Sequence, residues 1–435
     1  MAHNDQRNRK LSALAAAAAL PLAGGAVSAQ AQSSGSEQAA TPMEALVDAD
    51  VDLNFRYRFE NVDQEGFEEE ANASTLKSRL TYNSGTWQGA SLTMEFDHVT
   101  AVGSDKNYFD TRNGVTNTKG FDGSHPTVAD PEGANLNQAY LQFEGLADTR
   151  FRGGRQRILL DNQRFVGGVG WRQNEQTYDA LTLQNTALPD TTLFYGYIGH
   201  VNRIFGPDDD TPPADFNTDT HLLNAKYTGL PGHTIAGYSY WMDFEDAVAL
   251  ANRTTGAYVK GEFDLAITPF YRLEYADQSD HGDNPADYDA EYLHAFAGVK
   301  GQRWGAKVGV EELTEDDGSN QAFRTPYATL HAFQGFADKF LGTGGFNGTG
   351  TGITDTYVSG NVSLFGATFA AFYHDFEAED SGDDLGDEID LVAKRSFGDH
   401  FGGLIKYADY SSGDQGTGTS NDDTEKVWLQ LTASF

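Results

Sequence analysis

Hydrophobic and polar residues alternate one by one along much of the chain. In residues 53–60 the side chains Leu, Phe, Tyr and Phe alternate with Asn, Arg, Arg and Glu, and residues 426–435 repeat the pattern up to the terminal Phe435. The same alternation recurs in residues 76–82, 92–97, 304–311 and 389–394. A period of two predicts β-strands with one apolar and one polar face. Helical periodicity is not sustained after the N-terminal segment, so we expect an all-β fold.

The connections between the predicted strands alternate between short turns and long acidic loops. Short turns such as EGLADT and TGLPGH are followed by loops such as GPDDDTPPADFN and EAEDSGDDLGD. Outer-membrane barrels have short periplasmic turns, longer external loops and an even number of strands. We therefore predict a transmembrane antiparallel β-barrel over residues 51–435, with about 18 strands (16–18), short periplasmic turns and long acidic external loops. A barrel of this size leaves an aqueous lumen.

The N-terminus has the pattern of an exported protein. Residues 1–31 combine a basic cluster, a short apolar segment and small residues that offer cleavage sites after Ala29 or Ala31, which is the order of a Sec signal peptide. We expect residues 32–50 to form a short periplasmic segment before the barrel. The signal peptide and the strand pattern together predict the outer membrane of a Gram-negative bacterium.

Composition excludes several classes of site. The chain has a formal net charge of -34 and no cysteine, so disulfides, thiolate metal sites and a cysteine nucleophile are excluded. It lacks the motifs of serine hydrolases, zinc proteases and phosphate-binding loops, and we expect no enzyme activity and no cofactor. The acidic loops could bind Ca²⁺ or Mg²⁺ through carboxylate oxygens, but without EF-hand spacing we expect solvated loops and no metal site. Histidines beside loop residues, including His331, are expected on the solvated surface, and an acidic exported chain is not expected to bind nucleic acid.

One stretch is strongly basic. Residues 149–176 contain six arginines in a chain with 30 basic against 64 acidic residues. Because Phe151 is expected to face lipid, the alternation directs Arg150 and Arg152 to the lumen. Arg155 and Arg157 lie where the strand gives way to a loop, so their direction is open. The rest of the stretch is too apolar for an exposed loop, and we expect it to fold inward and narrow the pore.

The predicted lumen wall carries both signs of charge. Further bases on the lumen face are Lys226, Lys260, Arg272, Lys394 and Lys426, and the acids there are Glu60, Glu95, Asp97, Glu144, Glu274, Glu311 and Asp390. Rings of Arg or Lys select anions in pores, and the planar Arg fork suits carboxylates. The alternative is an arginine ladder paired across the lumen with the wall acids. The candidate pore-lining residues are Arg150, Arg152, Arg155, Arg157, Arg164, Arg172, Arg56, Arg58, Lys77, Arg79, Arg303 and Lys307.

Two stretches resemble a known family. Residues 154–181 and 325–342, the latter followed by DTYVSG, resemble the alginate export family of outer-membrane proteins. The resemblance implies a monomeric 18-stranded barrel whose electropositive lumen passes a polyuronate, with the arginine stretch contributing to the selectivity path. The terminal strand ending in Phe435 also resembles the signature that barrel-assembly machinery recognises. The acidic loops depart from this picture, because carboxylates at the mouth repel a polyuronate unless ions screen them.

These observations predict an outer-membrane channel with an Arg-lined lumen for anionic saccharides, by resemblance alginate or a similar polyuronate. One alternative is a general or nutrient-uptake porin for small organic anions. A second is a soluble secreted β-rich polysaccharide-binding protein or enzyme. The expected partners are outer-membrane lipid and lipopolysaccharide, the barrel-assembly machinery, and an anionic polysaccharide or small organic anions.

Overall fold

The computed structural model describes residues 38–103, 107–111, 123–206, 214–316, 318–319, 321–341, 352–414 and 421–435. The bounds of its elements are α2 (Pro42–Val47), β1 (Asp50–Gln64), β2 (Ala71–Asn83), β3 (Ala90–Ala101), β4 (Gly133–Leu146), β5 (Thr149–Gln156), β6 (Thr177–Asn185), β7 (Thr191–Asn202), β8 (Asp215–Tyr227), β9 (His233–Phe244), η2 (Val248–Leu250), β10 (Asn252–Glu262), β11 (Thr268–Asp280), β12 (Asp289–Lys300), β13 (Trp304–Leu313), β14 (Glu315–Asp316), β15 (Gln321–Ala322), η3 (Leu330–Ala332), β16 (Ile353–Leu364), β17 (Ala367–Ala378), β18 (Asp384–Phe397), β19 (Phe401–Ser412) and β20 (Thr424–Ser434).

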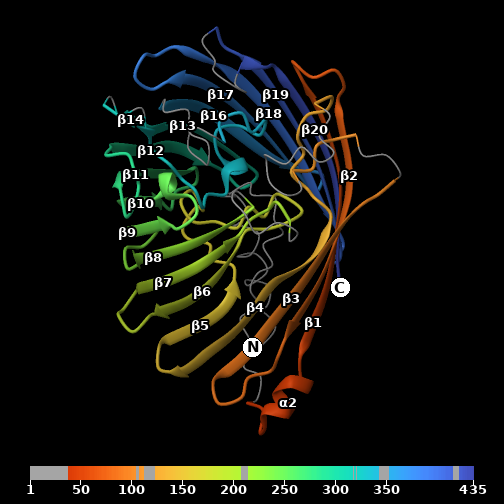
Figure 1. Ribbon diagram of the computed structural model, residues 1–435, viewed down its shortest axis with the longest axis vertical. Helices are drawn as coiled ribbons and strands as arrows, with labels where there is room; N and C mark the ends of the chain where they lie inside the picture. Colours follow the sequence, from red (N-terminus) through yellow and green to blue (C-terminus); the bar gives the residue numbers. More distant parts are fainter. Residues whose placement is uncertain are drawn as a thin grey trace.

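The strands form one closed antiparallel barrel. An 18-stranded sheet contains every strand except β14 and β15, which pair with each other. Its strands pair in chain order, and β1 also pairs with β20, which closes the sheet on itself. Figure 1 shows this wall curving around an interior. The predicted antiparallel β-barrel of about 18 strands is confirmed.

The two ends of the barrel differ in the length of their connections. At one end, here called the short-turn end, neighbouring strands are joined by turns as short as residues 147–148 and 365–366. At the opposite long-loop end the connections include residues 102–132, 157–176 and 314–352. This segregation follows from the antiparallel topology, because each strand reverses the direction of the one before it. The predicted alternation of short and long connections is therefore confirmed.

The outer face carries an apolar band below an acidic belt. In the band, apolar side chains at alternate positions are exposed, with Leu141 at 64% and Leu181 at 62%. Nearer the long-loop end, acids lie directly opposite each other on neighbouring strands in the pairs Asp219 and Asp243, Asp277 and Glu291, Asp375 and Asp387, and Asp409 and Glu425. Like charges at such positions repel and require water rather than hydrocarbon around them. The belt therefore marks the upper limit of the lipid-facing surface.

The inner face is polar yet buried, because two connections from the long-loop end fold into the interior. Residues 157–176, the arginine loop, follow β5, and residues 323–341, the aromatic loop, follow β15. Figure 1 shows these segments in the interior that the barrel wall surrounds. Their contributions to the hydrophobic core are Ile158, Phe165, Val166, Trp171, Phe323, Tyr327, Phe336, Ala337 and Phe340. The sequence-based expectation that the arginine stretch folds inward is confirmed.

The N-terminal part of the described chain lies at the short-turn end. The predicted signal peptide, residues 1–31, lies outside the described residues. The short helix α2 is capped by Thr41, whose hydroxyl accepts a hydrogen bond from the Glu44 amide, and the amide of Gly85 in the β2–β3 turn donates to Ala45 O at 2.8 Å. Among the described residues, no helix is long and apolar enough to cross a membrane.

Candidate functional site

The arginine loop reaches across the barrel interior. On the side of β1, Arg56 Nε donates to Gln173 Oε1 at 2.9 Å. On the side of β20, the Trp171 ring lies edge-on to Trp428 at 5.8 Å between ring centres. The loop also reaches β13 through Arg164, as described below. Its polar and apolar contacts on separate parts of the wall place it across the lumen.

The start and end of the arginine loop are joined by a network of ion pairs on β2 and β3. Arg157 Nε lies 2.5 Å from Glu175 Oε2, and its other nitrogens pair with Glu95. Arg79 Nη2 lies 2.8 Å from Glu175 Oε1, and Lys77 lies 3.5 Å from the same oxygen. Burial opposes ionisation of Glu175, but Arg157, Arg79 and Lys77 together hold its pKa well below the usual range. The carboxylate is therefore charged at neutral pH and fixes the loop to the wall.

The other two arginines of the loop are also paired with acids. Arg164 is fully buried, and its Nε donates to Glu311 Oε1 on β13 at 2.9 Å. Arg172 Nη1 lies 3.0 Å from Glu60 Oε2 on β1, and its Nη2 lies 3.2 Å from Asp338 Oδ2 in the aromatic loop. Removing one partner of such a buried pair leaves the other charge buried without an ion-pair partner. These pairs match the arginine ladder that the sequence offered as an alternative to free, anion-selecting charges.

The aromatic loop contributes a buried histidine. The ring of His331 stacks on Trp171 with 4.5 Å between ring centres and 7° between planes. Its Nδ1 lies 2.8 Å from Asp338 Oδ1, and its Nε2 lies 2.8 Å from Lys406 Nζ on β19. A neutral imidazole fits both contacts, with Nδ1–H donating to the carboxylate and Nε2 accepting from the ammonium. His331 is 4% exposed, so the expectation that it lies on the solvated surface is wrong.

The two loops are also joined through their backbones. The Gly167 amide donates to Tyr327 O at 2.8 Å, and the Thr329 amide donates to Gln163 O at 2.9 Å. Tyr327 Oη in turn lies 3.1 Å from Thr218 Oγ1 on β8. Because each loop supplies the other with backbone hydrogen bonds inside the barrel, the two form a single docked unit.

A carboxylate on β18 fixes the tip of the aromatic loop. Glu388 Oε1 accepts hydrogen bonds from the amides of Phe336 at 2.5 Å and Ala337 at 2.7 Å. Gly335 precedes them with φ +80°, and a Cβ atom there would lie 2.2 Å from Glu388 Oε2. Glycine is favoured at this position, because a side chain would strain the backbone and displace the Glu388 carboxylate that holds the loop.

The docking of the loops should weaken in mild acid. Burial, aided by the charge of Lys406 and opposed by Asp338, lowers the pKa of His331. A released loop therefore binds a proton that the docked loop does not, so docking is strongest above about pH 6.5 and loses up to about 1.4 kcal/mol per pH unit below it. In single-channel recordings the fraction of time in a more conductive state should rise between pH 7 and pH 5.

The variant His331→Asn tests this assignment, because asparagine keeps a polar side chain but does not titrate. In this variant, the fraction of time in the more conductive state should vary little between pH 7 and pH 5. An equal pH dependence in the variant and the parent protein would show that another group is responsible.

Docking of the loops should weaken a second time below about pH 4, where Asp338 in a released loop would bind a proton. Despite burial, the hydrogen bond with His331 and the charges of Lys426 and Arg172 lower the pKa of Asp338.

A second set of cations lies on the inner face near the short-turn end. These vestibule cations are Arg150, Arg152, Lys260, Lys307 and Lys394. Arg150 Nη2 donates to Gln184 Oε1 at 2.5 Å. Arg152 Nε donates to Gln142 Oε1 at 2.7 Å, and its guanidinium lies over the ring of Tyr140. Within the described part of the chain, none of the five forms an ion pair with a carboxylate.

The structure corrects two of the predicted pore-lining residues. Arg155 lies on the outer face, because β5 continues to Gln156 and Arg155 therefore shares the face of Phe151. Its Nε donates to Asp179 Oδ1 on that face at 2.7 Å. Arg303 lies in the exposed turn between β12 and β13, because β13 begins only at Trp304. Neither residue lines the lumen.

The remaining candidates lie inside the barrel. Arg150, Arg152, Lys307, Arg56, Arg58, Lys77 and Arg79 are on the inner face of the wall, and Arg157, Arg164 and Arg172 are on the arginine loop. Arg58 shows how closely the wall and loop fit, since its guanidinium lies 4.0 Å from the ring centre of Trp171. Sequence reasoning missed the aromatic loop and its anchor Lys406. The signal was available in the apolar composition of residues 323–341, which is unusual among the acidic loops.

The docked loops and the vestibule cations present charge and shape to the barrel interior. Within the described residues, no group of three or more His, Asp or Glu side chains is arranged to hold a metal ion. Flux through a pore follows its constriction and its potential, so the docked loops and the vestibule cations are the features that bear on passage.

Comparison with known proteins supports the fold and points to a family. A family model described as alginate export matches residues 47–309, and no curated protein sequence matches the chain. Among solved structures, Pseudomonas aeruginosa OpdK with vanillate is similar, at 14% identity and a TM-score of 0.67, covering 90% of this chain and 99% of that one. Acinetobacter baumannii OccAB2 gives 15% identity, a TM-score of 0.67 and the same coverage. At these identities the likeness to solved structures shows the fold alone.

Proposed function

The chain belongs to the alginate export family, and from this premise we propose that it passes anionic saccharides, such as a polyuronate, through a lumen lined by cations. The family is one of outer-membrane channels rather than enzymes, and the protein is an outer-membrane β-barrel. The alternative of a soluble secreted protein is therefore excluded. A Gram-negative source follows from the outer membrane as part of the same proposal.

The observation that carries this proposal is the set of vestibule cations. Unlike the arginines of the arginine loop, Arg150, Arg152 and Lys307 contact amide and aromatic groups, so their charge is available to a passing anion. Arg150 and Arg152 are two residues apart on one face of β5, an arrangement that suits successive carboxylates of a polymer. Acids on this face near the same end include Asp50, Asp52, Glu144 and Glu262, of which Glu262 is paired with Lys300 at 2.6 Å.

The distribution of charge fits export better than uptake. A polyanion that enters from the short-turn end meets the vestibule cations first, whereas one that approaches from the long-loop end meets the acidic belt and the acidic loops. Repulsion by exposed carboxylates extends over about 10 Å at 0.1 M salt. The acidic end therefore disfavours re-entry of a polyanion, and divalent ions or salt would relieve that barrier.

Planar-bilayer recording tests the proposed substrate class. The purified barrel should conduct anions in preference to cations, and mannuronate oligomers added on the short-turn side should block the single-channel current. Neutral malto-oligosaccharides of the same length are the control, and they should block far less. Cation preference, or equal block by the neutral and charged oligomers, would contradict the proposal.

The second candidate function is a channel for small organic anions. It is favoured by the likeness of the fold to OpdK, which was solved with vanillate, a small aromatic carboxylate. The same recordings separate the two functions. Block by small carboxylates at concentrations where mannuronate oligomers have no effect would favour this candidate.

A further inference from the structure

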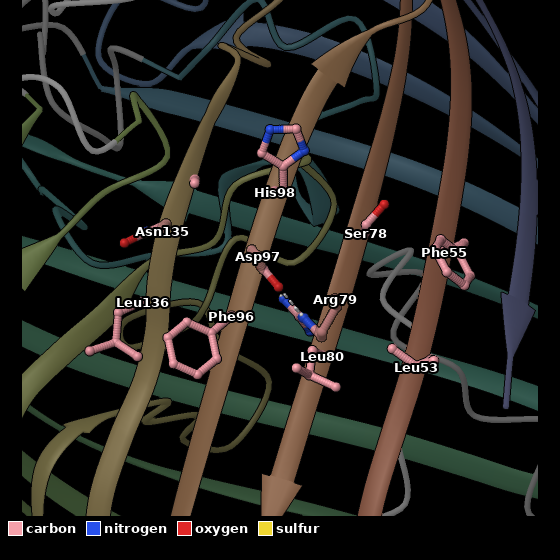
Figure 2. Close-up of a pocket in the computed structure, with 11 residues that line it drawn as sticks. Leu53, Phe55, Ser78, Arg79, Leu80, Phe96, Asp97, His98, Asn135 and Leu136 are labelled. Carbon is pink, nitrogen blue, oxygen red and sulfur yellow. Dashed lines mark hydrogen bonds and ion pairs between the residues drawn. The ribbon is translucent and has the colours of Figure 1, made fainter.

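A groove of about 420 Å³ crosses the outer face of β1, β2, β3 and β4. Figure 2 shows its lining, with side chains in two rows that follow the register of the sheet. In one row Leu80 lies opposite Leu53 on one side and Phe96 on the other, and Phe96 lies opposite Leu136. These four side chains are exposed on the face that carries the apolar band. The groove is therefore part of the lipid-facing surface.

The next row of the groove is different in chemistry. Ser78 lies opposite Phe55 on one side and His98 on the other. The hydroxyl and the imidazole project from the same face as the apolar row, and Figure 2 shows them beside it. Polar side chains facing hydrocarbon are costly, so this row requires a polar neighbour. The groove thus has an apolar row and a polar row, as an amphipathic ligand does.

On β3 the polar row follows the last apolar outward residue, whereas on β1 and β2 the outward Tyr57 and Leu76 lie beyond it. On β3 the outward residues Leu92, Met94 and Phe96 are apolar, and His98 follows them towards the long-loop end. On the neighbouring side, the outward Arg155 donates from Nη1 to Leu136 O at 3.3 Å while it is paired with Asp179. On β3 the imidazole of His98 therefore marks the change from apolar to polar outward residues, as at the edge of a lipid-facing surface.

A β-bulge accompanies the hollow. The register between β3 and β4 shifts between Glu95 and Phe96, because Asn137 is an extra residue on β4. Bulges bend a strand and increase its local twist. Ser78 and Ala134 lie in the polar row with the larger Phe55. Because their side chains are small, the groove is deeper at these two residues.

We propose that this groove binds one acyl chain of a phosphate-bearing membrane lipid. The chain lies along Leu80, Phe96 and Leu136, in continuity with the lipid-facing band. The ester and phosphate oxygens lie at Ser78 and His98, whose hydroxyl and imidazole can donate hydrogen bonds to them. This proposal concerns the outer face and is independent of what passes through the lumen.

Native mass spectrometry of the full barrel tests the site, with dipalmitoyl phosphatidylethanolamine as the added lipid. The parent protein should retain one lipid per barrel at a collision energy that strips annular lipid. The variant Ala134→Leu fills the groove and should weaken retention about tenfold, the effect of losing a few buried methylene groups. His98→Ala should weaken it about fivefold by removing a hydrogen-bond donor. The control Ala257→Leu adds the same bulk to the outer face of β10 and should retain the lipid.

Three results decide the proposal. Equal retention by the parent protein and Ala134→Leu would overturn it. A dimer of the parent protein that Ala134→Leu abolishes, without retained lipid, would overturn it in favour of a contact between two copies. Loss of retention in Ala134→Leu with unchanged single-channel conductance would support it, because the lumen is untouched. Heat-dependent migration on gels verifies folding, and Ser78→Leu replaces Ala134→Leu if that variant does not fold.

Discussion

Replacing Arg172 with glutamine should release the docked loops and increase the conductance of the barrel. Arg172 joins Glu60 on the wall to Asp338 in the aromatic loop, and its loss leaves both carboxylates buried without this cation. Breaking a buried pair in this way costs about 3 kcal/mol or more. That cost corresponds to about a hundredfold shift towards the undocked loops. Single-channel recording should show longer or more frequent large openings.

A matched variant and a double mutant separate this effect from general damage. Arg155→Gln removes an arginine from the same stretch but on the outer face, and it should leave conductance unchanged. Asp338→Asn should increase opening in the same direction as Arg172→Gln, and the double variant should open less than the sum of the two single variants, because both remove the pair between Arg172 and Asp338. Unchanged openings in Arg172→Gln, with a normally folded barrel, would show that the loops are held without this pair.

Replacing both Arg150 and Arg152 with glutamine should lower the anion selectivity of the channel. Each guanidinium is worth about 0.5–1 kcal/mol to an anion that passes within about 4–8 Å in water. Loss of both should reduce the ratio of anion to cation permeability about fivefold or more. Reversal potentials in a salt gradient measure this ratio directly, and block by mannuronate oligomers should weaken in parallel.

The matched control removes two arginines from the outer face. Arg395 is exposed and follows Lys394 on β18, and Arg253 is exposed on the outer face of β10. Glutamine at both positions should leave the permeability ratio unchanged. If the outer-face and inner-face variants shift the reversal potential equally, net charge rather than the vestibule determines selectivity.

The inner-face assignment of Arg150 and Arg152 could be predicted because it depends on local geometry. A residue two positions along a strand returns to the same face, so the lipid-facing Phe151 was enough to direct its neighbours. Arg155 obeys the same rule, but the prediction needed the end of β5, and strand ends are the least reliable part of a sequence pattern. The error at Arg303 has the same origin, since β13 starts one residue later.

The partners of the loop arginines could not be predicted in the same way. Arg164 and Glu311 are 147 positions apart, and Arg172 and Asp338 are 166 positions apart. No local rule connects residues at that separation, because their contact depends on how both loops fold into the barrel. The apolar composition of the arginine loop indicated only that it would turn inward.

The sequence by itself determined the barrel, its approximate strand number, the segregation of short and long connections, and the faces of most strand residues. All of these follow from a period of two and from turn length. Only the tertiary structure decided which cations are neutralised and which are available. Charge compensation depends on distances of a few ångströms between groups far apart in the chain, and the sequence places bases and acids on the same face without showing which of them meet. The loop arginines thus hold the loops in the lumen, while Arg150 and Arg152 stay beside amides.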